Sequence, residues 1–183
     1  LAAGWLVPAG AAETVLEFEP AQTQIHWTLD AFVHTVHGTF QLRSGTVRFD
    51  PATGNASGEL TADARSGESG NGSRDGKMHK SVLESAKFPD IVFKPRHVEG
   101  HIPDHGKATL NVEGSFLLHG TEHAFTLPIE VNIELGQVVA DSKFSIPYVA
   151  WGLKNPSTFV LRVDQKVGLD IHASARIVHN GTH

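Results

Sequence analysis

The chain has 183 residues, of which 40% are hydrophobic and 19% charged, and this is the composition of a globular protein long enough for one domain with a sizeable core. Its formal net charge of −5 lacks the basic excess of a nucleic-acid-binding protein, so we expect no nucleic-acid partner. The absence of cysteine excludes disulfides, thiolate metal sites and cysteine nucleophiles, and no segment has the ~20 consecutive apolar residues of a membrane-spanning helix.

Residues 1–12 have the features of a truncated secretion signal. An apolar run opens the segment, and Ala9-Gly10-Ala11 follows Pro8 in the small-x-small pattern that signal peptidase accepts. We therefore predict that residues 1–12 are a signal-peptide remnant, that residues 13–183 form a single domain, and that the protein is periplasmic or secreted.

The rest of the chain has a dominant period of two, which is typical of β-strands with one buried face. In residues 125–135 every odd position is apolar and most positions between them are polar, and residues 110–118 and 163–177 follow the same rule. Shorter strands are predicted at 25–29, 39–42, 45–50, 56–64, 89–94 and 143–148. Turn residues in DPATGN (50–55), HGTE (119–122) and LGQ (135–137) separate several of them. Eight or nine strands at hairpin spacing predict an all-β fold, as a closed antiparallel barrel or a sandwich.

One segment departs from this pattern. From residue 74 to about residue 85 the spacing predicts a short amphipathic helix, with Met78, Val82 and Leu83 on one stripe and Asp75 in the first turn. Lys77, Lys80, Ser81 and Glu84 are predicted to face water. A narrow apolar stripe must cover something apolar, and the open end of a barrel offers such a surface. Spacing alone leaves open whether the helix is a movable lid or a fixed plug.

Signals for metal binding and catalysis are incomplete. His34 and His37 would lie on opposite faces of a strand, whereas His119 and His123 flank a hairpin loop and could face one another. Neither pair has a third ligand at the required spacing. The segment GESGN (67–71) lacks the final glycine of a serine nucleophile elbow. A histidine-rich metal-binding or enzyme-like barrel therefore stays as one alternative, and a structural β-domain with a filled core as another.

Several motifs in the expected order resemble the YceI-like polyisoprenoid-binding family over roughly residues 17–178. An Arg74-Asp75 pair opens the helix, the strand FPDIVF (88–93) follows, and the hairpin GSFLLHGTEHAFTLPI (114–129) comes later. One segment departs from the family pattern, because FSIPYVAWGLKNPS (144–157) has Pro147 and Tyr148 where many members have an arginine and a nearby acidic residue. Any headgroup contact made by such an arginine is absent here.

The resemblance implies an eight-stranded, antiparallel, lipocalin-like β-barrel with one short helix near its opening. It implies that an elongated apolar cavity binds and carries or stores a long isoprenoid lipid, either a polyisoprenoid or an isoprenoid quinone. It implies no enzymatic activity, no required cofactor and no metal. The expected partners are the lipid and, transiently, a membrane surface, and a homodimer is left open.

Within such a barrel, the residues predicted to contact the lipid are aromatic and aliphatic side chains in or beside the strands, together with the helix stripe. They are Trp27, Phe40, Phe49, Met78, Val82, Leu83, Phe93, Phe116, Phe125, Leu127, Ile129, Phe144, Ile146 and Trp151.

Overall fold

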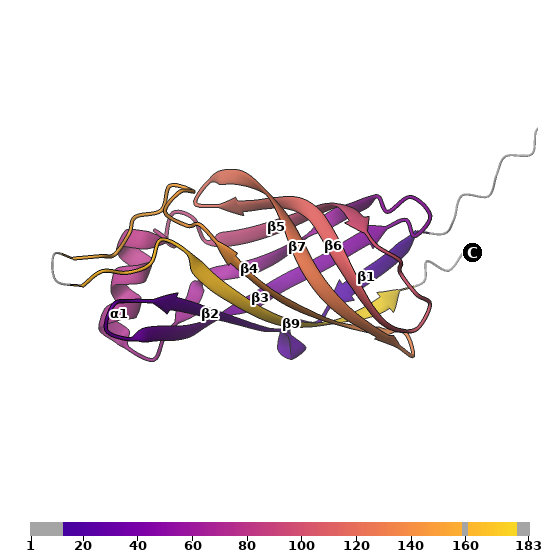
Figure 1. Cartoon of the computed structure of the whole chain (residues 1–183), viewed down its shortest axis with the longest axis horizontal. Coiled ribbons are helices and arrows are strands. Elements are labelled where there is room, and N and C mark those ends of the chain that lie inside the picture. The colour runs from indigo at the N-terminus through magenta and orange to yellow at the C-terminus, as the bar shows by residue number, and fades with distance from the viewer. Residues whose placement is uncertain (1–12, 159–160, 179–183) are drawn as a thin grey trace, which may run out of the picture.

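The computed structural model describes residues 13–158 and 161–178, so the predicted signal segment 1–12 lies outside the described residues (Figure 1). The strands are β1 (Thr14–Phe18), β2 (Gln24–Asp30), β3 (Thr35–Phe49), β4 (Ala56–Glu68), β5 (Asp90–Glu99), β6 (Gly106–Leu118), β7 (Thr121–Glu134), β8 (Gln137–Ile146) and β9 (Val167–Val178). Between β4 and β5 lies helix α1 (Gly72–Lys77), which continues into the π-helical turn η2 (Met78–Val82).

The strands form one closed antiparallel barrel. Each strand from β3 to β9 pairs with the next along the chain, and β1 and β2 each pair with both β3 and β9. β1 and β2 therefore share one position in the wall, and the short 3-10 helix η1 (Pro20–Gln22) interrupts them, since Pro20 has no N–H for the ladder. The predicted eight-stranded barrel with a short helix is confirmed.

The strand boundaries differ from prediction at several points, and the predicted strand 143–148 starts earlier, as β8 (Gln137–Ile146). β1 was not predicted, and the predicted strands 39–42 and 45–50 are one strand, β3, whose register shifts near Leu42 and Ser44 break the period of two. The segment 125–135 ends one residue early, because Leu135 has φ 48° in the β7–β8 turn and is fully exposed. Leu135 therefore belongs to the turn and not to the inner face.

The helix is shorter than the predicted 74–85. It begins at Gly72, where the N-cap Asn71 accepts a hydrogen bond from the Arg74 N–H at 3.0 Å. It ends at Val82, after the Leu83 N–H donates to the Met78 carbonyl at 2.9 Å, and Glu84 then turns the chain with φ 46°. The wider π turn allows Met78, Val82 and Leu83 all to face the barrel interior.

The two ends of the barrel are built differently (Figure 1). The end near residues 13 and 178, the first and last described, carries the connections 50–55, 100–105 and 135–136, and it is packed by a buried apolar cluster of Leu110, Val131, Ile133 and Val138. The other end carries α1, η2 and the connections 31–34, 119–120 and 147–166. We call these the closed end and the helix end.

Candidate ligand cavity

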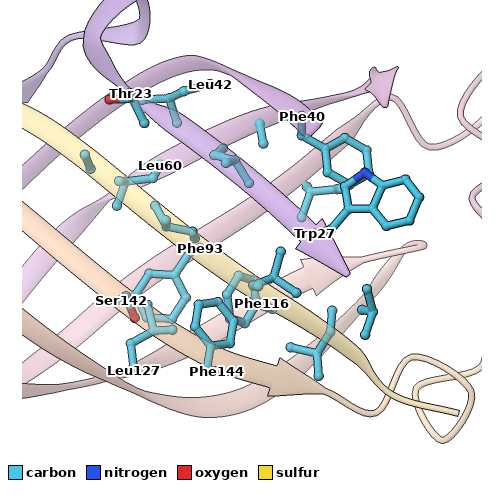
Figure 2. Close-up of a pocket in the computed structure, with 18 of the residues that line it drawn as sticks. Thr23, Trp27, Phe40, Leu42, Leu60, Phe93, Phe116, Leu127, Ser142 and Phe144 are labelled. Carbon is cyan, nitrogen blue, oxygen red and sulfur yellow. The ribbon is translucent and has the colours of Figure 1, made fainter. Parts of the chain in front are cut away.

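The barrel encloses an elongated cavity with a volume of about 770 Å³, lined by inward side chains from all nine strand segments (Figure 2). Inward residues such as Phe116, Leu127 and Phe144 are only partly buried, because they border empty space. No large side chain among the described residues falls below 2% exposure. The barrel is thus hollow, unlike the alternative of a core filled by its own side chains.

The structure places most of the predicted contact residues on the cavity wall. The side chains that line it are Trp27, Phe40, Phe49, Met78, Val82, Leu83, Phe93, Phe116, Leu127, Ile129, Phe144 and Ile146. Their contact with a ligand stays a prediction. Phe125 and Trp151 were predicted with them but do not line the cavity.

Phe125 and Trp151 instead belong to an aromatic cluster behind the lining. The Phe125 ring lies 5.6 Å from Phe116 and 5.4 Å from Phe144, the two rings that line the cavity. Trp151 is stacked parallel to the His123 ring at 4.4 Å and meets Phe125 edge-on at 6.0 Å. Such pairs stiffen a wall beyond their buried area. This cluster supports the side of the cavity next to the β6–β7 hairpin.

Several lining residues were missed at the sequence level. Many are aliphatic residues whose strand and face follow from alternation, such as Leu42, Leu60, Leu169 and Ile171. The period of two could have identified these. Ser142 was a less obvious lining residue, because serine is polar. Its hydroxyl donates to the Pro128 carbonyl at 2.6 Å, so it presents little unpaired polarity to the cavity.

The exposed and the charged residues of the lining gather at the helix end. The exposed residues among those that line the cavity are His34, Asn71, Ser73 and Lys77, and all four lie there. Lys77 was predicted to face water only, but it also borders the cavity. Within the described residues, the cavity therefore reaches the surface at the helix end, between the 31–34 connection, the start of α1 and the residues Pro156, Leu161 and Val163. We call this region the mouth.

Polar contacts fix α1 and η2 over the mouth. Arg74 donates to the Ser69 hydroxyl at 2.8 Å and to the Ser69 carbonyl at 3.1 Å, and the Ser69 N–H donates to the Asp75 carboxylate at 3.0 Å. Partial burial raises the pKa of Asp75, but the hydrogen bonds from Ser69 outweigh it and hold that pKa below its ordinary value. The carboxylate of Asp75 is therefore ionised near neutral pH.

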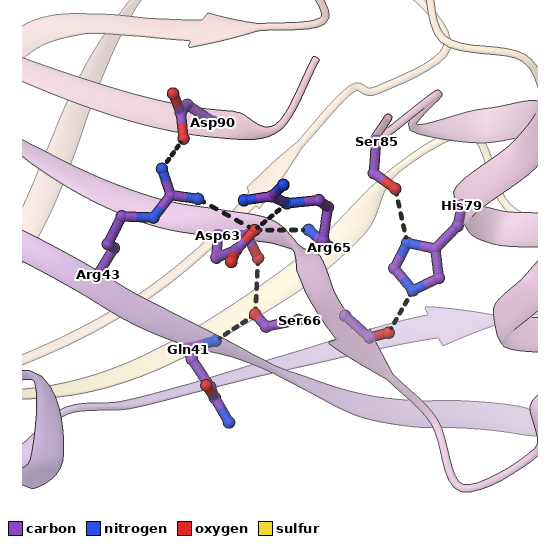
Figure 3. A network of polar contacts seen from close by, with 9 residues as sticks. Gln41, Arg43, Asp63, Arg65, Ser66, His79, Ser85 and Asp90 are labelled. Carbon is purple, nitrogen blue, oxygen red and sulfur yellow. Dashed lines mark hydrogen bonds and ion pairs between the residues drawn. The ribbon is translucent and has the colours of Figure 1, made fainter. Parts of the chain in front are cut away.

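His79 joins η2 to the end of β4 (Figure 3). Its Nε2–H donates to the Gly67 carbonyl at 2.7 Å, so its Nδ1 accepts from the Ser85 hydroxyl at 3.0 Å when the ring is neutral. Beyond η2, the His119 Nε2–H donates to the Glu84 carboxylate at 2.6 Å. Arg74 and Asp75 thus hold the start of the helix, and His79 and Glu84 hold its end, while the apolar stripe faces the cavity.

A second polar network lies on the wall beside the β3 bulge (Figure 3). Arg43 bridges the carboxylates of Asp63, at 3.2 Å, and Asp90. Burial raises the pKa of Asp63, but hydrogen bonds from Arg65 and Arg43 leave it below its ordinary value. These groups are partly exposed and point away from the cavity lining. Their place indicates a structural role in holding β3, β4 and β5 together.

Tyr148 positions the long connection 147–166. Its side chain is buried, lines the cavity and packs with Leu118 and Leu153. Burial raises the pKa of Tyr148 to about 12, and nearby Asp164 acts in the same direction. Its hydroxyl therefore stays protonated and donates to the Asp164 carbonyl at 2.7 Å.

The histidine pairs considered as metal ligands have separate partners. His119 binds Glu84, whereas His123 pairs across the ladder with Phe116 and stacks on Trp151. In the part of the chain that the structure describes, no three His, Asp or Glu side chains gather as metal ligands would. Within the same ranges, no helix has the length and apolar character needed to cross a membrane.

A hollow antiparallel barrel with one polar mouth places the protein among the cavity-bearing β-barrels. The YceI-like domain matches residues 16–175, and the chain belongs to that family. Its fold is similar to that of BcnA from Burkholderia cenocepacia, with a TM-score of 0.69 and 17% identity over 86% of this chain and 98% of that one.

Two further solved structures are similar. One is a polyisoprenoid binding domain from Saccharophagus degradans implicated in plant cell wall breakdown, with a TM-score of 0.66 and 12% identity over 89% of this chain and 98% of that one. The other is a Campylobacter jejuni YceI protein, with a TM-score of 0.60 and 17% identity over 73% and 80%. At these identities the likeness is one of fold. None of the curated protein sequences compared with the chain matches it.

Proposed function

We propose that this barrel binds one long isoprenoid lipid, a polyisoprenoid or an isoprenoid quinone, and carries or stores it. The observation that carries the proposal is the apolar cavity of about 770 Å³ that runs through the barrel and reaches the surface at one polar end. Membership of the YceI-like family supports it, as does the similarity to a domain described as polyisoprenoid binding. The few titratable lining side chains, His34, Arg74, Lys77 and Tyr148, all lie at the helix end, and this supports binding over catalysis.

The energetics of loading favour a carrier that works between membranes. Burying each CH₂ from water is worth about 0.8 kcal/mol, so a long chain would exceed the ceiling of roughly 20 kcal/mol on measured affinities. A membrane is therefore the relevant starting point. Transfer from bilayer to cavity exchanges one hydrocarbon environment for another, so the net affinity depends on packing, chain entropy and any headgroup hydrogen bond. That near balance allows both uptake and release.

The position of the polar residues suggests an orientation for the lipid. Hydrocarbon would lie along the apolar interior, and an oxygen-bearing headgroup would lie at the mouth near Ser73 and Lys77, which carry exposed donors. The reverse orientation would place the headgroup against the buried cluster of Leu110, Val131, Ile133 and Val138, where an unpaired polar group is costly.

The first test is to purify the protein without detergent, extract it with organic solvent and identify the extract by mass spectrometry, with elemental analysis of the same sample. We expect an isoprenoid in about equimolar amount. Unbranched fatty acids alone, or a stoichiometric metal with no lipid, would contradict the proposal.

A matched pair of variants tests whether the cavity is the binding site. Ala62 lines the cavity between Leu42 and Ile91, so Ala62→Phe should obstruct it. Ala124 is exposed on the outer face of β7, so Ala124→Phe adds the same bulk outside. Only the first should lose binding of a fluorescent isoprenoid, with both still folded by circular dichroism. Equal binding by the two variants would show that the lipid does not bind in the cavity.

A further inference from the structure

The mouth is bordered by the most exposed pair of apolar side chains in the described chain. Phe32 is 88% exposed and Val33 is 74% exposed, and they are adjacent at the tip of the β2–β3 connection. Their chain neighbours Ala31 and His34 both line the cavity. The Phe32 N–H donates to the Arg162 carbonyl at 3.0 Å, which holds this tip beside the 147–166 connection.

Isolated exposed hydrophobic residues are common and need no explanation. Phe32 and Val33 differ from such residues, as a comparison with Leu135 shows. Leu135 is the third large apolar residue exposed in the described chain, and its position follows from a tight turn with φ 48°. Phe32 and Val33 have no such turn conformation. Two adjacent bulky side chains in water beside a cavity entrance are typical of an interaction surface.

The charge around the mouth is opposite in sign to that of the whole chain. The connections 31–34, 69–89, 119–120 and 147–166 together hold seven lysines and arginines and three acidic residues. The basic residues are Arg74, Lys77, Lys80, Lys87, Lys154, Arg162 and Lys166. The protein as a whole has a formal net charge of −5. These connections are therefore basic on an acidic protein, although the strand ends beside them add Asp30, Glu68 and Asp90, of which Asp90 is paired with Arg43.

Six of these seven basic groups are available to an external partner. All except Arg74 are exposed, and among the described residues none of the seven forms an ion pair within the chain. Exposed apolar side chains at an end of the barrel whose connections are basic are the pattern of a surface that lies on anionic lipid headgroups and inserts its apolar side chains.

We propose that the helix end is a membrane-docking surface, in which Phe32 and Val33 insert into the interfacial region of an anionic bilayer while Lys77, Lys154 and Arg162 contact lipid phosphates. The cavity mouth then faces the bilayer, so that a lipid can pass between the two without crossing water. This goes beyond lipid binding in the cavity, because docking can occur whether or not the barrel holds an isoprenoid.

The experiment measures partition of the protein into vesicles that contain no isoprenoid. Vesicles of phosphatidylcholine with phosphatidylglycerol are compared with vesicles of phosphatidylcholine alone, at low and high salt. We expect binding to the anionic vesicles that weakens as salt rises. The double variant Phe32→Ser/Val33→Ser should lower that partition at least about tenfold. Leu135→Ser, which removes an equally exposed side chain at the closed end, should leave it unchanged.

A matched pair of lysine variants tests the contribution of the basic residues at the helix end. Lys77→Gln should lower partition into anionic vesicles about fivefold, whereas Lys107→Gln, an exposed lysine at the closed end of β6, should not. Unchanged partition for both Lys77→Gln and the Phe32/Val33 variant would overturn the proposal.

Insertion can be measured directly because the chain has no cysteine. Val33→Cys and Leu135→Cys each provide one thiol for a polarity-sensitive fluorophore. We expect anionic vesicles to shift the emission of the label at 33 to the blue and to leave the label at 135 unchanged. A water-like signal at position 33 with vesicles present would overturn the proposal. The proposal would also be overturned if the Phe32→Ser/Val33→Ser variant changed only the oligomeric state, measured by ultracentrifugation, and not the partition into vesicles. That result would identify a second copy of the chain as the partner of this surface.

Discussion

The closed end and the helix end of this barrel both carry inward-facing apolar side chains, but these side chains differ in how deeply they are buried. At the closed end Val131, Ile133 and Val138 are buried against one another, and the connections are short. Those three side chains also border the cavity, whereas at the helix end Met78 and Val82 border it from only half-buried positions, and the connections 69–89 and 147–166 are long. Long connections are unusual in a compact domain unless they have a function.

This difference means that one end of the barrel mainly stabilises the fold, while the other end gives access to the cavity. A packed apolar cluster stabilises the closed end, while the cavity reaches the surface at the other end. The helix end has a buried cluster of its own, Leu118, Tyr148 and Leu153, against which Val82 and Leu83 pack. In addition, α1 and η2 make polar contacts with β4 and with the β6–β7 hairpin. Such contacts contribute less net free energy than buried apolar surface, and they can exchange with water.

The largest effect is expected from a charge placed in the closed end. Ile133 is 7% exposed within its cluster, so Ile133→Glu would bury a carboxylate without a partner and should lower the free energy of unfolding by roughly 3–5 kcal/mol. Val163→Glu places the same group near the mouth, where water can reach it, and should cost about 1 kcal/mol. Urea denaturation of the two variants measures both values. Equal losses would mean that the two ends do not differ in burial.

The next effect concerns the wall near the helix end, where Gly38 allows Trp27 to lie flat on β3. A Cβ at Gly38 would come within 2.2 Å of both the Trp27 ring and the Glu68 carbonyl oxygen. Gly38→Ala should therefore displace the ring, change the near-UV circular dichroism and cost about 1–3 kcal/mol. Gly72→Ala is the control, since nothing lies within 4 Å of a Cβ there. An unchanged tryptophan signal in Gly38→Ala would show that this half of the wall is adaptable.

A smaller effect is expected from the apolar stripe of the helix, and it distinguishes a lid from a plug. Because Met78 and Val82 are only partly buried and border the cavity, Met78→Ser/Val82→Ser should cost about 1–2 kcal/mol while accelerating transfer of a fluorescent isoprenoid to acceptor vesicles. Val138→Ser, in the closed-end cluster, should cost more and leave the transfer rate unchanged. A loss of several kcal/mol with an unaltered transfer rate in the double variant would identify the helix as a plug.

Most of the wall was predictable because alternation directly reports which side of a strand is apolar. It identified β6, β7 and β9 and placed Leu127 and Ile129 on the inner face. It failed at β1, whose five residues are too few for a clear period, and at β3, where the register shift near Ser44 divides one strand into two apparent ones. Both failures concern features that only pairing with neighbouring strands determines.

The cavity was less predictable than its wall. Alternation places Phe125 inward but does not show that Phe116 and Phe144 stand between it and the cavity. The hollow interior and the gathering of Asn71, Lys77 and His34 at one mouth depend on how the barrel closes, and no local pattern reports this. The stripe of Met78, Val82 and Leu83 was identifiable, because its period is local.

The smallest effect is a local response to acid at the helix end. The pKa of Asp75 lies below its ordinary value of 3.8, because the hydrogen bonds from Ser69 outweigh partial burial. A carboxyl group whose pKa is lowered by folding stabilises the fold fully above the ordinary pKa, and this contribution is lost as the pH falls through the lowered value.

We therefore expect amides of residues 72–82 to keep their protection from neutral pH down to about pH 5 and to lose part of it by about pH 2.5, while amides of Val131 and Ile133 change less. Hydrogen exchange, corrected for the intrinsic rate at each pH, measures this difference. Asp75→Asn should weaken helix protection already at neutral pH and remove most of its acid dependence, since the amide carries no charge to lose. Helix protection that stays constant to about pH 2.5 in the parent protein would show that the apolar stripe, and not the Asp75–Ser69 contact, holds the helix over the mouth.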